Sequence, residues 1–143
     1  MEHCNGLPTP NKVDSLIGTD VNDSEAKRDW TNSYASVIGM MLYLASSTRP
    51  DISFSVHQCA RLTQNTKASH KTAVKRICRY LQGIKENGLV FNTSKKLVVD
   101  CYADVDFAGL WGHEDPQDPI CARSRTGFVV TFSNCTLLWV SKL

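Results

Sequence analysis

A run of lysine and arginine side chains in the middle of the chain has the spacing to meet a phosphate backbone. A helix predicted over Ser69–Leu81 has apolar residues on one face and basic residues on or beside the other. Residues 34–85 as a whole carry 8 basic and 1 acidic side chain, although the net charge of the protein is only +2. A solvated face is the usual role of such residues, but the near absence of acids favours contact with phosphates. The candidate nucleic-acid-binding residues are Lys71, Lys75, Arg76 and Arg79.

Two carboxylates, Asp104 and Asp106, form a second pattern of residues that can take part in chemistry. They stand two positions apart in a segment with strand-like alternation, so both side chains are expected on one face of a strand. On the local pattern alone, a solvated structural role at the end of a strand is the commoner explanation.

Other potential ligands or nucleophiles do not cluster. The six cysteines are scattered without a C-x-x-C pair, which argues against a zinc knuckle or a disulfide framework and is typical of reduced, mostly buried thiols. His57 and His70 have no carboxylate or cysteine at ligand spacing, so packing or surface roles are expected.

The polar start of the chain is unlike a signal peptide, and apolar runs such as Ile38–Ala45 are far shorter than the roughly 20 residues of a bilayer span. We therefore expect an intracellular protein without a membrane segment.

Three helices are expected between residues 33 and 85. The first begins at Ser33 as N-cap and ends before Pro50, and Asp51 is expected to cap a second helix that extends to about Thr63. The third is the basic helix over Ser69–Leu81. Residues 1–33 are polar and acidic, so a disordered lead-in is expected there.

The periodicity changes from helical to strand-like near residue 86. Short apolar runs bounded by turn residues predict strands over 89–91, 97–103, 126–132 and 136–140. Hairpin loops are expected at 92–95 and 133–135, and an exposed loop over 110–125. The fold class is therefore α+β, a helical segment over 34–85 followed by an antiparallel meander over 86–143.

Five segments, in unbroken order, resemble the end of the reverse transcriptase and the start of RNase H in copia-type retrotransposon Pol polyproteins. Together they extend over about residues 34–143. The segments are YASVIGMMLYLASSTRPDISFSVHQCARL, HKTAVKRICRYLQGIKENGLVF, YADVDFAG, RSRTGFVV and LLWVSK.

The resemblance implies a helical connection segment followed by a truncated, incomplete RNase H-like sheet. It places Asp104 as catalytic residue and first metal ligand, with Asp106 as the second acid of the local pair, and it implies Mg²⁺ as cofactor. The implied partners are an RNA/DNA hybrid or template–primer and the rest of the Pol polyprotein. Further acidic ligands of the family follow the S-K signature at Ser141 and Lys142, so no nuclease activity is expected from this chain alone. Nor does a Y-x-D-D polymerase motif occur in the sequence.

Three hypotheses remain open at this point. The chain is a part of a reverse transcriptase/RNase H enzyme, a non-catalytic nucleic-acid-binding module that shares the scaffold, or a transposon remnant without function. Salt-dependent binding to an RNA/DNA hybrid separates the first two from the third.

Overall fold

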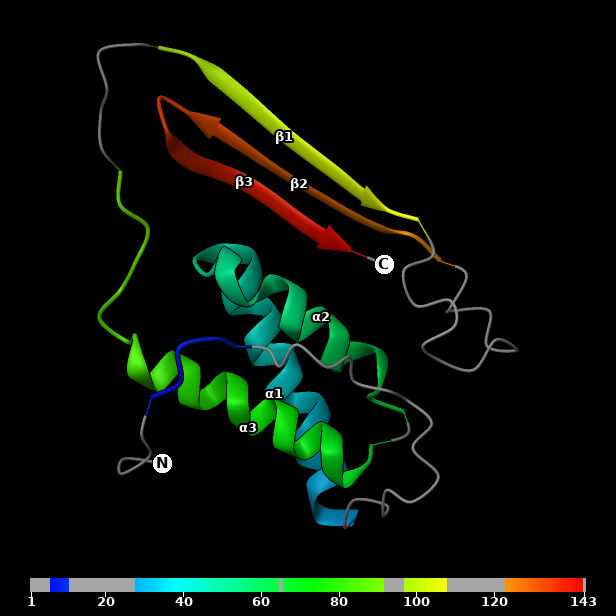
Figure 1. Ribbon diagram of the computed structural model, residues 1–143. Coiled ribbons are helices and arrows are strands. Elements are labelled where there is room, and N and C mark those ends of the chain that lie inside the picture. Colours follow the sequence, from blue (N-terminus) through cyan, green and yellow to red (C-terminus); the bar gives the residue numbers. More distant parts are fainter. Residues whose placement is uncertain (1–5, 11–27, 65, 92–96, 108–122, 143) are drawn as a thin grey trace.

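The computed structural model describes residues 6–10, 28–64, 66–91, 97–107 and 123–142 (Figure 1). Three α-helices and a short 3-10 helix precede a three-stranded sheet, which confirms the α+β class. The helices are α1 (Arg28–Ser47), η1 (Pro50–Ile52), α2 (Ser53–Arg61) and α3 (Ala68–Gly83). The strands are β1 (Val99–Asp106), β2 (Arg125–Phe132) and β3 (Cys135–Lys142). In this described part of the chain, no helix has the length and apolar character needed to cross a bilayer.

Helix α1 starts earlier than the sequence pattern indicates. It begins at Arg28, so Ser33 lies inside the helix and the prediction of Ser33 as N-cap was wrong. The apolar periodicity becomes visible only from Tyr34, because the first turn is mostly polar, and periodicity therefore underestimates the length of the helix. The predicted end before Pro50 is confirmed.

Asp51 does not cap α2, contrary to the prediction from the sequence. It lies within η1, and its carboxylate accepts hydrogen bonds from Arg49 Nε at 3.0 Å, Arg49 Nη2 at 2.6 Å and the Tyr80 hydroxyl at 2.7 Å. Burial raises the pKa of Asp51, but the hydrogen bonds from Arg49 and Tyr80 outweigh it and leave the pKa below its ordinary value. The carboxylate thus joins the turn after α1 to α3 instead of capping the start of α2.

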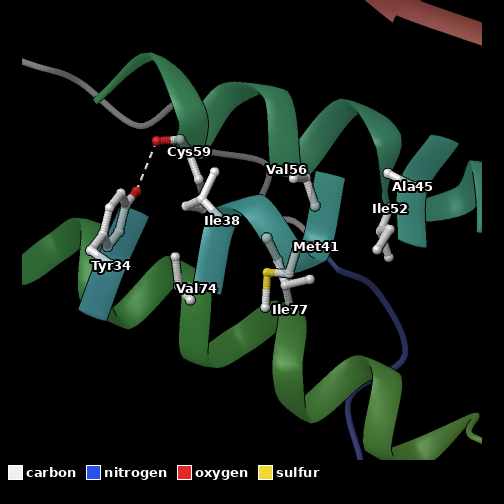
Figure 2. Close-up of a cluster of buried hydrophobic side chains, with 9 residues drawn as sticks. All are labelled: Tyr34, Ile38, Met41, Ala45, Ile52, Val56, Cys59, Val74 and Ile77. Carbon is white, nitrogen blue, oxygen red and sulfur yellow. Dashed lines mark hydrogen bonds between the residues drawn. The ribbon is translucent and has the colours of Figure 1, made fainter. Parts of the chain in front are cut away.

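Among the described residues, the main cluster of buried hydrophobic side chains lies between the helices (Figure 2). At the polar edge of this core, the Tyr34 hydroxyl donates a hydrogen bond of 2.8 Å to the carbonyl of Cys59, so the buried hydroxyl has a hydrogen-bond partner. Burial raises the pKa of the Cys59 thiol to about 11, so this cysteine is a reduced core residue. The buried side chains of the cluster are Tyr34, Ile38, Met41, Ala45, Ile52, Val56, Cys59, Val74 and Ile77.

Helix α3 matches its predicted position closely. It contributes Val74 and Ile77 to the core and exposes the opposite face, as the amphipathic pattern predicts. His70 is fully buried, and its Nδ1 accepts a hydrogen bond of 3.0 Å from the backbone N–H of Lys67. The packing role expected for His70 is confirmed.

The sheet is an antiparallel meander in the order β1-β2-β3, as predicted. Ser133 and Asn134 form the turn between β2 and β3 with φ angles of 53° and 65°, the left-handed pair typical of a tight hairpin. The strand predicted over 89–91 was wrong: Val90 and Phe91 are 74% and 61% exposed, and three apolar residues are too few to specify pairing. The predicted loop at 92–95 and most of 110–125 lie outside the described residues.

The sheet covers the helical layer through β3, which packs against α2 (Figure 1). Trp139 in β3 donates a hydrogen bond from its indole nitrogen to the carbonyl of Ala45 in α1 at 2.6 Å. Arg125 at the start of β2 places its guanidinium 4.6 Å from the ring centre of Phe54 in α2. These contacts fix which face of the sheet meets the helices, and therefore which strand residues lie near them.

Candidate nucleic-acid interface

Asp104 and Asp106 lie on β1, the edge strand of the sheet, and both are exposed. Asp104 stands opposite Gly127 and Asp106 opposite Arg125 in the antiparallel register. Because side chains alternate along a strand, the two carboxylates share one face, as expected from their spacing. That face is the one that meets the helices, since the same register connects Tyr102 through Val129 to Trp139.

The two carboxylates offer the hard oxygen ligands that Mg²⁺ prefers. Within the described residues, no group of three or more His, Cys, Asp or Glu side chains is arranged to hold a metal ion. Magnesium sites in enzymes that act on phosphates often use only one or two carboxylates together with water and substrate phosphates.

The predicted basic face of α3 is partly open to solvent. Lys75 and Arg79 are exposed, whereas Lys71 and Arg76 are half-buried. Arg76 Nη2 donates a hydrogen bond of 3.0 Å to the hydroxyl of Thr9, so residues 6–10 pass across part of this helix. Lys75 and Arg79 are accordingly the members best placed to reach a phosphate.

The structure does not bring the basic face of α3 and the Asp104–Asp106 pair together. Helix α3 packs against α2, while the sheet lies over the other side of the helical layer (Figure 1). The two candidate sites suggested by the sequence are thus separate surfaces.

A different group of basic side chains surrounds Arg125, which stands opposite Asp106 at the junction of α2 and the sheet. We call His57, Arg61, Arg125 and Lys142 the seam cluster. Arg125 is only 8% exposed, and its Nη1 donates a long hydrogen bond of 3.5 Å to the Ser141 hydroxyl. Burial and the charge of Arg61 lower the pKa of Arg125, while the charge of Asp106 opposes them.

The pKa of His57 responds to two other members of the seam cluster. Burial lowers the pKa of His57, and the positive charges of Arg125 and Lys142 lower it further. His57 was expected in a packing or surface role, and Arg61 and Lys142 were not singled out from the sequence. His57 and Arg61 are four residues apart on α2, so they lie on one face of the helix. This spacing was the signal in the sequence that could have identified them as neighbours. Periodicity does not reveal that this face meets the sheet.

Comparison with known proteins identifies relatives among transposon polyproteins. The chain is 36% identical over 110 residues to the retrovirus-related Pol polyprotein from transposon TNT 1-94 of Nicotiana tabacum, covering 77% of this chain and 8% of that protein. It is 31% identical over 135 residues to the retrovirus-related Pol polyprotein from transposon RE1 of Arabidopsis thaliana, covering 94% of this chain and 8% of that protein. An uncharacterized mitochondrial protein of Arabidopsis thaliana is 34% identical over 137 residues, covering 94% of this chain and 50% of that protein.

The chain belongs to the family of retrovirus-related Pol polyproteins of transposons, which confirms the resemblance to copia-type Pol. It spans about 8% of the length of the two Pol polyproteins named above. No protein-family model matches the chain. No solved structure matches it either.

Proposed function

We propose that this chain is the region of a Pol polyprotein in which the reverse transcriptase leads into RNase H, and that it helps to hold nucleic acid. In this proposal the parent protein copies RNA into DNA and cleaves the RNA strand of RNA/DNA hybrids by two-metal hydrolysis. The contribution of the chain itself is a surface for the hybrid or template–primer.

The observation that carries this proposal is the basic face of α3. Lys75 and Arg79 are exposed on a helix whose opposite face is fixed in the core by Val74 and Ile77. No acidic residue occurs between residues 66 and 85, so the charged side chains of α3 itself are all basic. A rigid helix with exposed cations suits the phosphate backbone, which attracts Lys and Arg without regard to base sequence.

The Asp104–Asp106 pair supports the RNase H part of the proposal. We assign Asp104 as the first metal ligand of the nuclease and Asp106 as its neighbour, with Mg²⁺ held jointly by these carboxylates, further Pol residues and substrate phosphates. An edge strand is a suitable support for such a pair, because it leaves both side chains open to a polyanionic substrate.

A non-catalytic nucleic-acid-binding module is the second candidate. It is favoured by the finding that no third ligand gathers with Asp104 and Asp106 in the described part of the chain. Under this alternative the chain binds a hybrid through α3 without any contribution to cleavage, whereas a remnant without function does neither.

The test of the proposal is charge reversal on α3. The Lys75→Glu, Arg79→Glu double variant is expected to weaken binding to an RNA/DNA hybrid. Because two phosphate contacts are lost, the slope of log affinity against log salt concentration should become less negative by about 2. Binding is measured by fluorescence anisotropy of a labelled hybrid at several salt concentrations.

The matched control is Lys85→Glu compared with the single variant Lys75→Glu. Both lysines are exposed and both changes alter the charge equally, but Lys85 lies beyond the end of α3. The proposal requires Lys75→Glu to weaken binding more than Lys85→Glu. Equal effects of the two variants, or none from the double variant, would show that the face does not contact nucleic acid.

A further inference from the structure

A short segment that precedes the helices, residues 6–10, lies along α3 and contacts it at two points (Figure 1). We call this segment the strap. The Thr9 hydroxyl accepts a hydrogen bond of 3.0 Å from Arg76 Nη2. Gly6 lies against Gly83, the last residue of α3, so closely that a Cβ added to Gly83 would stand 2.9 Å from Gly6 Cα. The strap therefore touches α3 both at its end and two turns earlier.

The sequence of the strap, GLPTP, favours the extended backbone that these two contacts require. Each of its prolines fixes its own φ and biases the residue before it towards extended backbone. The three extended steps from Gly6 to Thr9 span about 10 Å. The seven helical steps from Gly83 back to Arg76 also rise by about 10 Å. The strap and α3 thus match in length between the contacts and run in opposite directions.

Arg76 is the residue over which the strap and a nucleic acid would compete. Its side chain is half-buried, Nη2 is engaged by Thr9, and the buried Nε has no hydrogen-bond partner among the described residues. Nε and Nη2 form one edge of the guanidinium, the kind of edge that a phosphate binds through two parallel hydrogen bonds. Arg79 lies one turn further along α3, so a phosphate backbone bound to Arg79 would pass near Arg76.

The charge of the sequence favours attachment of the strap. Residues 1–33, to which the strap belongs, carry six acidic and three basic side chains, whereas residues 34–85 carry eight basic and one acidic. The part of the chain that contains the strap is therefore attracted to the part that contains α3, as a polyanionic ligand would be.

We propose that the strap is an autoinhibitory element that withholds Arg76 from nucleic acid. While the strap is attached, the basic face of α3 contacts phosphates through Lys75 and Arg79, and detachment adds Arg76 as a third contact. The inference rests on the proposed function, because the ligand is the same RNA/DNA hybrid. It adds that the affinity of this face is set by a segment of the same chain.

The test is Gly83→Ala in the full chain. The added methyl group would stand 2.9 Å from Gly6 Cα, which is too close for atoms that are not bonded, so the strap should be displaced. Alanine is a better helix former than glycine, so α3 itself should not be weakened. Binding of a labelled RNA/DNA hybrid is expected to become tighter. The slope of log affinity against log salt concentration should become more negative by about 1, the effect of one additional phosphate contact.

Three further variants assign this effect to the strap and to Arg76. Gly39→Ala is the matched control, because Gly39 is also a helical glycine but a Cβ there would lie in open space, and binding should not change. In the Gly83→Ala, Arg76→Gln double variant the slope should return to the wild-type value. Thr9→Val removes the hydroxyl that accepts from Arg76 at nearly constant side-chain size, so it should shift the slope in the same direction as Gly83→Ala.

Attachment of the strap is measured separately, by the nuclear Overhauser effect between the Hα protons of Gly6 and residue 83. The contact is expected in the wild type and in Gly39→Ala and should be lost in Gly83→Ala. If it is lost but hybrid binding is unchanged or weaker, the strap is only a packing element and the inference is overturned. A contact that persists in Gly83→Ala overturns it as well, because the two glycines would then not be closely packed.

The outcomes separate this inference from the proposed function. If charge reversal at Lys75 and Arg79 weakens hybrid binding while Gly83→Ala keeps the wild-type slope, the inference is overturned and the proposed function stands. If neither the wild-type chain nor Gly83→Ala binds the hybrid, both are overturned.

Discussion

Replacing Ile77 with alanine is expected to lower the free energy of unfolding by about 2–5 kcal/mol, the cost of deleting a large aliphatic side chain from a packed core. Ile77 is 1% exposed and lies between α1 and α3 in the core cluster (Figure 2). Small domains have total stabilities of about 5–15 kcal/mol, so this loss removes a large fraction of the stability. Urea denaturation followed by circular dichroism measures it as a shift of the midpoint at constant slope.

Leu97→Ala is the control for this prediction. Leu97 is 77% exposed, so the same kind of truncation should change the free energy of unfolding by no more than about 0.5 kcal/mol. The assignment of the core to the helices would be contradicted if Leu97→Ala destabilised the chain as much as Ile77→Ala.

Replacing Trp139 with alanine is expected to loosen the attachment of the sheet to the helical layer, at a cost of about 3 kcal/mol. The change removes the 2.6 Å hydrogen bond to the Ala45 carbonyl together with the packing of the indole. Full burial would cost about 3–5 kcal/mol, and Trp139 is half-buried, so the lower end of that range applies. Because the core cluster contains no strand residue, amide exchange should accelerate in β1–β3 far more than in α1–α3.

Trp139→Phe keeps an aromatic ring at the junction but removes the indole donor and the second ring. The lost hydrogen bond alone costs about 1 kcal/mol, so a loss between this value and that of Trp139→Ala is expected. If Trp139→Ala and Trp139→Phe were equally harmful, the ring would contribute nothing. If neither changed exchange in the strands, Trp139 would not be the contact that joins the layers.

Elements defined by a local signal could be predicted from the sequence. Helix α3 has a clear apolar face, and the hairpin between β2 and β3 has Ser133 and Asn134 at the positions that need positive φ. The errors arose where a local signal competed with a tertiary contact. Asp51 has the side chain of a helix cap, but Arg49 and Tyr80 engage its carboxylate. Residues 89–91 have the composition of a strand, yet no strand forms there.

The candidate site was predictable only in its separate parts. Alternation along β1 placed Asp104 and Asp106 on one face, and helical periodicity placed Lys75 and Arg79 on another. Neither pattern states which faces meet, because the docking of β3 on α2 depends on long-range packing. The sequence therefore indicated a basic face on α3 and a separate pair of carboxylates, but it did not indicate that Arg125 is the cation opposite Asp106.

The central claim, that this part of Pol holds nucleic acid, is tested most directly by the affinity of the wild-type chain for an RNA/DNA hybrid across a range of salt concentrations. With phosphate contacts from Lys75 and Arg79, log affinity should fall linearly with log salt with a slope of about −2. Hybrids of unrelated base sequence should give the same line, because phosphate contacts are not sequence-specific. Absence of binding at low salt, or an affinity that does not respond to salt, would contradict the claim.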